Sequence, residues 1–247
     1  MKKELIIGPV VVVVVWWLLT ATGLVKPLFL ASPLEVTSSL WYQSVDGSLF
    51  ADIWATVARL VVGFLLAVAL GIPTGLLLGA SSRLYSAVEI PLDFFRSLPA
   101  MAVFPLFLLA FGLGDPAKIA ITTWSGALII VINTMYGVRT AKVGRQAAAK
   151  VFGASRYQVF MKVILPDALP QIVAGLRISV SLCLIVVIVS EMFMGTKAGI
   201  GMSIYNAGLL YDTPKMLAGI MVAGLVGYLL NKAFAVAERR IVHWSGH

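Results

Sequence analysis

Charged side chains inside long apolar segments are the residues of this sequence whose types and spacing could do chemistry. Arg96 follows Asp93 by three positions in one such segment, and Glu191 lies near the end of another. Ionisable residues within a membrane span are costly and are functional candidates by default. The guanidinium of Arg96 carries a fork of donors that suits an anionic group such as a sulfonate. An internal ion pair of Arg96 with Asp93 or Glu191 explains the same residues equally well.

Pro99 and Asn133 complete this set of candidates for a solute path. Pro99 shares its apolar segment with Pro91 and Pro105, and three prolines free several backbone carbonyls. Such a distortion is tolerated in a membrane only where protein or a water-filled cavity meets the freed groups. Asn133 lies in the following apolar segment, where a hydrogen bond between helices is the better explanation than a substrate contact.

The sequence pattern offers no constellation typical of an enzyme or a metal site. His243 and His247 are four residues apart, but they lie in a terminal tail, and we expect no metal there. Ser125-Gly126 lacks the preceding glycine that a nucleophile elbow needs. A G-x-x-x-x-G-K-[ST] motif is also absent from the chain. We therefore expect no cofactor in this chain, and any ATP and Mg²⁺ would be bound by another polypeptide.

Composition indicates a membrane protein with several spans. The 247 residues are 60% hydrophobic and 12% charged, whereas soluble domains carry about 25% charged residues. Several apolar runs exceed the roughly 20 residues needed to cross a bilayer. In such proteins an excess of Lys and Arg usually marks the cytoplasmic loops. The formal charge of +8 therefore does not indicate nucleic-acid binding. The single cysteine, Cys183, lies in an apolar run and is interpreted as a packing residue.

The apolar runs predict an all-α polytopic fold with a single transmembrane domain over residues 1–247. Ser32-Pro33-Leu34-Glu35 predicts a capping box that begins a short helix ending near Gln43. Residues 26–56 are expected at the extracytoplasmic interface, and residues 195–213 are expected to form a glycine-rich outer loop. The six predicted spans cover about 5–24, 57–80, 86–113, 117–137, 172–194 and 215–236.

The distribution of cations predicts that both ends of the chain are cytoplasmic. With the N-terminus inside, eleven loop cations face the cytoplasm and four face outward. The positive-inside rule favours this arrangement. Arg59 and Arg177, near span ends, are expected to extend to the lipid headgroups. The inner cations are Lys2, Lys3, Arg83, Arg139, Lys142, Arg145, Lys150, Arg156, Lys162, Arg239 and Arg240, and the outer ones are Lys26, Lys118, Lys197 and Lys215.

A basic insert at residues 139–170 separates the fourth and fifth predicted spans. The pattern predicts a helix from Arg139 to Phe152, with Gly153 in the left-handed position that follows a helix. Ser155 is expected to cap a second helix of about residues 156–164, which Pro166 closes. Two short helices with small residues at the elbow would form a knob for a partner's groove. An amphipathic linker lying on anionic lipid is an equally weighted alternative.

The spacing within this insert resembles the EAA loop of the permease subunits of bacterial ATP-binding-cassette (ABC) importers. The resemblance is carried by Ala148, Ala149, Gly153 and the Val163-x-Leu165-Pro166 segment. It extends to the nitrate, sulfonate and taurine branch of that family. The segments that carry this wider resemblance are residues 95–106, 153–156, 165–170, 175–177, Glu191 and 199–201.

The resemblance implies a type I importer permease whose insert docks on a cytoplasmic ATPase. The implied partners are a second permease copy, two ATPase subunits and an extracytoplasmic solute-binding protein, all around a bacterial inner membrane. The implied function is import of a small anion, of sulfonate, taurine, nitrate or bicarbonate type, by alternating access. Ala147 stands where the family has its glutamate, so docking would rest on shape. The implied coupling residues are Ala147, Ala148, Ala149, Gly153, Ala154, Ser155, Leu165 and Pro166.

A self-contained secondary transporter or channel is the alternative function. Arg96, Asp93 and Glu191 would then form an ion relay. Inverted repeats would favour this class, and the sequence displays none.

Overall fold

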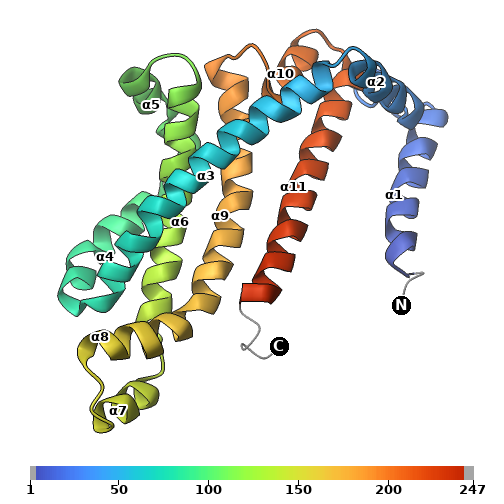
Figure 1. Ribbon diagram of the computed structural model, residues 1–247. Coiled ribbons are helices and arrows are strands. Elements are labelled where there is room, and N and C mark those ends of the chain that lie inside the picture. Colours follow the sequence, from blue (N-terminus) through green and yellow to red (C-terminus); the bar gives the residue numbers. More distant parts are fainter. Residues whose placement is uncertain (1–3, 242–247) are drawn as a thin grey trace. The chain divides into compact units, whose positions relative to one another are not determined.

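The computed structural model describes residues 4–241, and within that range the regular structure is entirely helical (Figure 1). Among the described residues, four helices are long and apolar enough to cross a membrane, and α1 carries a shorter apolar stretch, Ile7–Ala21. The helices are α1 (Glu4–Ala21), α2 (Pro33–Val45), α3 (Ser48–Ala80), α4 (Ser82–Ser97), α5 (Phe104–Phe111), α6 (Asp115–Arg139), α7 (Val143–Val151), α8 (Arg156–Val159), α9 (Leu165–Met194), α10 (Ile200–Leu209) and α11 (Thr213–Ile241).

These helices form two compact units. The first unit comprises the described residues up to 57 together with 191–226, and its core includes Ala31, Val36 and Ala218. Trp16 lies in α1, and its indole Nε1 donates to the Ala31 carbonyl at 2.9 Å. This bond gives a polar partner to an aromatic residue in the middle of an apolar helix. The predicted capping box between Ser32 and Glu35 begins α2, as expected.

The second unit comprises 58–190 and the described residues from 227 onward, and its core depends on small residues. A Cβ atom built on Gly71 would lie 2.8 Å from the Ile130 side chain, and one on Gly75 would lie 2.6 Å from Thr134. Since real Cβ atoms do not approach so closely, α3 packs directly on α6 through its glycines. Cys183 is buried and contacts Gly126 on α6, which confirms its packing role.

The predicted third span, residues 86–113, is not one helix. It contains α4, a 3-10 turn at Ala100–Ala102 and α5. Leu98 adopts an extended backbone (ψ 125°) at the end of α4, because the residue before a proline is disfavoured in the helical region. Pro99 therefore breaks this span, whereas Pro73 and Pro170 lie inside continuous helices.

The basic insert also departs from the predicted pair of short helices. The α6 helix continues to Arg139, and α7 forms a separate short helix. Pro166 does not close the second helix: α8 leads through a π-turn at Phe160–Ile164 directly into α9. Pro166 lacks an amide donor, and the wide turn directly before it accommodates the missing bond. The insert is therefore one short helix followed by the start of a long one.

The segment at residues 195–213 is likewise more ordered than the predicted loop. Its central part forms the helix α10. Gly195 and Gly199 shape the connection from the end of α9 to the start of α10, with φ values of 62° and 152°.

Candidate functional site

Arg96 borders a pocket of about 340 Å³ in the second unit, at the junction of α4 and the middle of α6. Its guanidinium lies 3.2 Å from the Asp93 carboxylate, and both side chains are half exposed. One of the two ion pairs considered from the sequence is thus formed, without removing Arg96 from the pocket. The lining residues are Phe95, Arg96, Leu98, Pro99, Ala100, Trp124, Ser125, Leu128, Ile129 and Leu182.

This pocket combines one cation with mostly apolar walls. Trp124 and Leu128 come from α6, and Pro99 comes from the segment that interrupts the predicted span. The guanidinium has five N–H donors, so its contact with Asp93 leaves donors for a further anion. The arrangement can hold a small anion through Arg96 and an aliphatic or aromatic part through the apolar walls.

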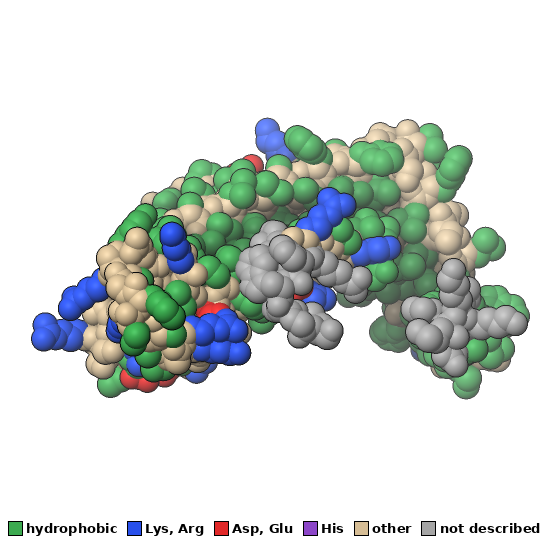
Figure 2. All heavy atoms as spheres, turned by 60° about the horizontal axis from the view of Figure 1, so that its bottom comes forward, with side chains coloured by type: hydrophobic (Ala, Val, Ile, Leu, Met, Phe, Trp, Pro, Cys, Tyr) green, Lys and Arg blue, Asp and Glu red, His purple; other side chains and the backbone are tan. Residues whose placement is uncertain are grey.

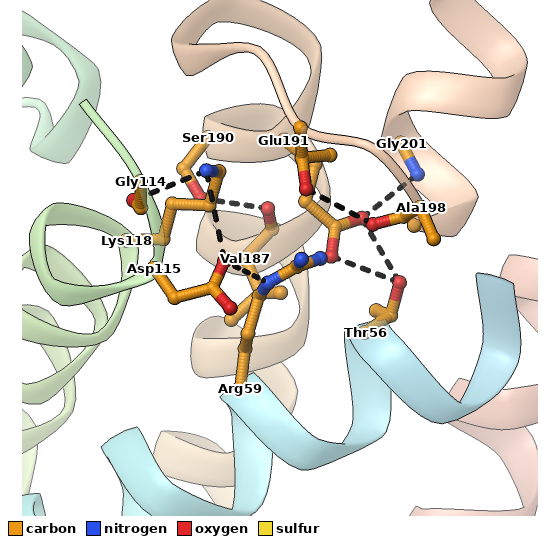
Figure 3. A network of polar contacts seen from close by, with 12 residues as sticks. Thr56, Arg59, Gly114, Asp115, Lys118, Val187, Ser190, Glu191, Ala198 and Gly201 are labelled. Atoms are coloured by element: carbon orange, nitrogen blue, oxygen red, sulfur yellow. Dashed lines mark hydrogen bonds and ion pairs between the residues drawn. The ribbon is translucent and has the colours of Figure 1, made fainter. Parts of the chain in front are cut away.

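Glu191 is fully buried in the first unit, where it holds the start of α10 (Figure 3). The hydroxyl of Thr56 lies 2.9 and 3.0 Å from its two carboxylate oxygens, and the Gly201 amide donates to Oε2 at 3.0 Å. A Cβ atom on Gly199 would lie 2.6 Å from the same carboxylate. The carboxylate therefore accepts a backbone amide at the start of α10, and the residue at position 199 beside it must be a glycine.

Two residues near the start of α3 complete this anchor of α10, and their role was missed from the sequence. Asp52 Oδ1 accepts the Gly199 amide at 2.8 Å, and Thr56 Oγ1 accepts the Ile200 amide at 2.9 Å. The first amides of a helix lack partners within it, so side-chain acceptors stabilise its start. The i,i+4 spacing of Asp52 and Thr56 was the available signal, but spacing alone does not identify a partner 144 residues away.

Arg59, in the second unit, is buried and paired, and the prediction that it extends to headgroups is wrong (Figure 3). Its Nε donates to Asp115 Oδ1 at 2.8 Å. Lys118 is fully buried, donates to the Gly114 carbonyl at 3.1 Å and lies 3.9 Å from Asp115. Lys118 is therefore part of α6 packing and not an outer loop cation. These partners matter because a buried cation without one would be strongly destabilising.

Asn133 joins two helices of the second unit, as its interpretation as an interhelical residue predicted. Its Oδ1 accepts from Gln171 of α9 at 2.9 Å, and its Nδ2 donates to the Ile129 carbonyl. Arg177 was also expected at the headgroups, but it lies 3.5 Å from Glu238 of α11.

The insert presents small and basic side chains at its surface. Ala147, Ala148 and Gly153 are exposed, whereas Ala149 and Ala154 are partly covered. Gly153 has φ 79°, the left-handed value expected there, and Ser155 caps α8 through a capping box with Gln158. Leu165 and Pro166 lie at the start of α9. Figure 2, in which the lower end of Figure 1 comes forward, displays Lys and Arg side chains around this end of the molecule.

A single carboxylate fixes the insert to α9. Asp167 pairs with the guanidinium of Arg145 and also accepts the Lys142 amide at 3.2 Å. Gln146 donates to the Ala141 carbonyl at 3.1 Å. These bonds orient α7 without a glutamate at position 147.

Comparison with known proteins defines the family. Residues 67–243 match the family of binding-protein-dependent transport system inner membrane components. The chain belongs to this family and is a membrane permease subunit of an ABC importer, which is the non-catalytic membrane component of such a system. This finding favours the importer over a self-contained secondary transporter or channel.

The most similar relatives include permeases named for taurine, aliphatic sulfonates and nitrate. The chain is 32% identical to the taurine transport system permease protein TauC of Escherichia coli over 96% of this chain and 87% of that one. It is 31% identical to the putative aliphatic sulfonates transport permease protein SsuC of Bacillus subtilis, covering 96% and 85%. It is 32% identical to the nitrate import permease protein NrtB of Leptolyngbya laminosa, covering 85% and 78%.

Solved structures confirm the permease fold. The inward-facing MetNI methionine ABC transporter matches with a TM-score of 0.69 at 24% identity, over 78% of this chain and 95% of that chain. A bacterial alginate ABC transporter matches with a TM-score of 0.61 at 19% identity, over 98% and 96%.

Proposed function

We propose that this permease imports a small organic or inorganic anion of the sulfonate, taurine, nitrate or bicarbonate type. The observation that carries the proposal is the placement of Arg96 at a mostly apolar pocket beside α6. The names of the relatives, which transport taurine, aliphatic sulfonates and nitrate, support it. Arg96 and Pro99 line the solute path in this proposal, and Glu191 and Asn133 position the helices around it.

The exposed insert is the ATPase-coupling element in this proposal. Ala147, Ala148, Ala149 and Gly153 approach a cleft on a separate cytoplasmic ATPase, which binds ATP and Mg²⁺. ATP binding draws the inserts of two permease copies together and opens the path outward, and hydrolysis returns it to the inward state. A solute-binding protein delivers the anion at the extracytoplasmic face, and both ends of the permease are cytoplasmic.

Uptake by a reconstituted complex tests the role of Arg96. Proteoliposomes would contain the permease, its ATPase and its binding protein, and uptake of labelled taurine, nitrate and an alkanesulfonate would be measured. We expect Arg96→Gln to lower uptake of the transported anion about 10- to 100-fold, since a charge-assisted hydrogen bond contributes about 1.5–3 kcal/mol.

The control is Arg83→Gln, which removes an exposed cation at the start of α4 outside the pocket. Both variants should hydrolyse ATP in the assembled complex. Unchanged uptake by Arg96→Gln in an intact complex would overturn the proposed solute contact.

A further inference from the structure

Helix α4 has one polar face, and Arg96 lies at one end of it. Tyr85, Glu89, Asp93 and Arg96 follow one another at intervals of four, four and three residues. At about 100° per residue these positions fall within an arc of roughly 80°. The adjoining apolar face carries Ile90 and Phe94, about 60° and 100° beyond Asp93 around the helix, and these side chains are 80% and 60% exposed. The helix is therefore amphipathic along its whole length.

Two contacts determine where α4 lies along α6. Arg96 shares its pocket with Ser125 and Ile129, near the middle of α6. Tyr85 lies at the other end of α4, and the guanidinium of Arg139, the last residue of α6, stands 3.7 Å from its ring centroid. Tyr85 and Arg96 are eleven residues apart, or about 16 Å of helix.

The two contacts place α4 alongside one half of a membrane-spanning helix, and not flat on the membrane surface. From Ile129 to Arg139 is ten residues, or about 15 Å, which matches the length of α4 between its contacts. Figure 1 displays α4 beside the lower half of α6. Glu89 and Asp93, between the two contacts, therefore lie at membrane depth.

These two carboxylates are not covered by the chain. Glu89 and Asp93 are both exposed, and α4 contains no buried residue. Charged side chains at membrane depth face protein or a water-filled cavity, since exposure to lipid costs several kcal/mol. The apolar face of α4 suits lipid or protein, and the polar face suits water or a polar protein surface.

We propose that the solute path continues from the Arg96 pocket along the polar face of α4 to a cytoplasmic mouth formed by Tyr85 and Arg139. This inference rests on the proposed anion import. Arg139 supplies a second cation for the leaving anion, and its stacking on Tyr85 fixes its position. Tyr85 in turn donates to Glu89 at 2.6 Å. Asp93 and Glu89 balance the two cations, so the anion is guided without being trapped.

Cysteine labelling tests whether water reaches the polar face of α4. The method suits this chain because only one native cysteine has to be replaced. Cys183 is buried and would be replaced by Cys183→Ala. Single variants Glu89→Cys and Asp93→Cys report on the polar face, and Ile90→Cys and Phe94→Cys on the apolar face serve as matched controls. The probe is 2-sulfonatoethyl methanethiosulfonate, a water-soluble sulfonate that does not cross lipid, added to inside-out vesicles containing the complete transporter.

We expect the Glu89→Cys and Asp93→Cys variants to react at least ten times faster than the two controls. Equal rates at all four positions would place α4 in bulk water at the surface and overturn the inference. Equally slow rates would mean that the polar face is covered by protein, with the same consequence. Variants that do not elute with the complex on size exclusion are left out of the comparison. Because each face is represented by two positions, the comparison can still be made when one variant is left out.

The mouth and the proposed function are tested separately. We expect Arg139→Gln to lower anion uptake at least fivefold with unchanged ATP hydrolysis, and Arg139→Lys to restore much of it. Fast labelling combined with an Arg96→Gln variant of normal uptake would retain the path and reject the anion contact. Slow labelling combined with uptake that depends on Arg96 would reject the path along α4 and retain the proposed function.

Discussion

At the scale of single residues, buried polar groups in this permease act mainly on the backbone. Glu191 accepts the Gly201 amide, and Thr56 both donates to Glu191 and accepts the Ile200 amide. Each group is buried, so a lost partner is not replaced by water. The loss of stability on a substitution there is therefore set by the buried polar group that is left without a hydrogen-bond partner.

Thr56→Val should therefore destabilise the protein by about 1–3 kcal/mol, because it removes the donor to Glu191 and the acceptor for Ile200 while keeping the side-chain shape. Thr56→Ser keeps the hydroxyl and should cost less than half as much. Thermal unfolding of both variants in detergent measures the difference. Equal melting temperatures for Thr56→Val and the wild type would contradict this reading of the network.

Gly153 offers a second test at this scale. Its φ of 79° is unfavourable for residues with a Cβ atom, so Gly153→Ala should cost about 1–2 kcal/mol in the insert. Gly144, in α7, has no atom within 4 Å of an added Cβ, and Gly144→Ala is the matched control, expected to be neutral or slightly stabilising. Amide hydrogen exchange of residues 143–160 measures local stability. Faster exchange in the Gly144→Ala variant than in the Gly153→Ala variant would contradict the assignment.

At the scale of helices, close approach of α3 and α6 determines the core of the second unit. An alanine at Gly75 would place its Cβ 2.6 Å from Thr134 and 2.8 Å from the Val131 carbonyl. We expect Gly75→Ala to destabilise the protein by about 1–3 kcal/mol through overpacking. Gly224→Ala in α11, where a Cβ meets no atom within 4 Å, is the control. Melting temperatures in detergent measure both, and a tolerated Gly75→Ala would mean that the two helices separate readily.

The start of α2 should respond to pH. Hydrogen bonds from Ser32 lower the pKa of Glu35 below its ordinary value of 4.5. The folded pKa is the lower one, so the stabilisation is fully present above the unfolded pKa and is lost as the pH falls through the folded pKa. The melting temperature of the wild type should exceed that of Glu35→Ala at pH 7, and the gap should close in this acid range. A difference in melting temperature that grows as the pH falls would contradict this prediction.

Local rules predicted much of the helical structure. The capping box at Ser32 and the left-handed Gly153 depend on neighbours in the chain, and both were confirmed. The prolines were harder, because the sequence predicted a span that continued through Pro99. Whether a proline breaks a helix or is absorbed depends on the backbone groups that neighbouring helices offer.

The polar partners could not be predicted. Arg59 pairs with Asp115, 56 residues away, and Thr56 bonds to Glu191, 135 residues away. Such pairs depend on how each helix is rotated about its axis, which hydropathy does not determine for segments apolar on all sides. The sequence identified Arg96 and Glu191 as unusual, but it could not distinguish a pocket residue from a backbone anchor.

At the scale of the whole molecule, the positive-inside rule predicts which loops lie on each side of the membrane. We expect a reporter inserted after Gly47, in the turn between α2 and α3, to be accessible from outside the cell. A reporter inserted after Gly153 should be accessible only from the cytoplasm, because the basic insert follows the positive-inside rule. Protease protection in spheroplasts and in inside-out vesicles measures both. The opposite result at either position would invert the proposed topology.

The π-turn at Phe160–Ile164 has a consequence for the angular setting of the insert. Here the Leu165 amide bonds to the Phe160 carbonyl, five residues earlier, so the turn contains one residue more than an α-helical turn. Deleting one residue would convert it to ordinary helix and rotate everything before it by about 100° about the axis of α9. The alanines and Gly153 would then point in another direction while their own structure stayed intact. This turn therefore sets the direction in which the insert faces about the axis of α9. A one-residue deletion should leave the insert correctly folded but facing in a different direction.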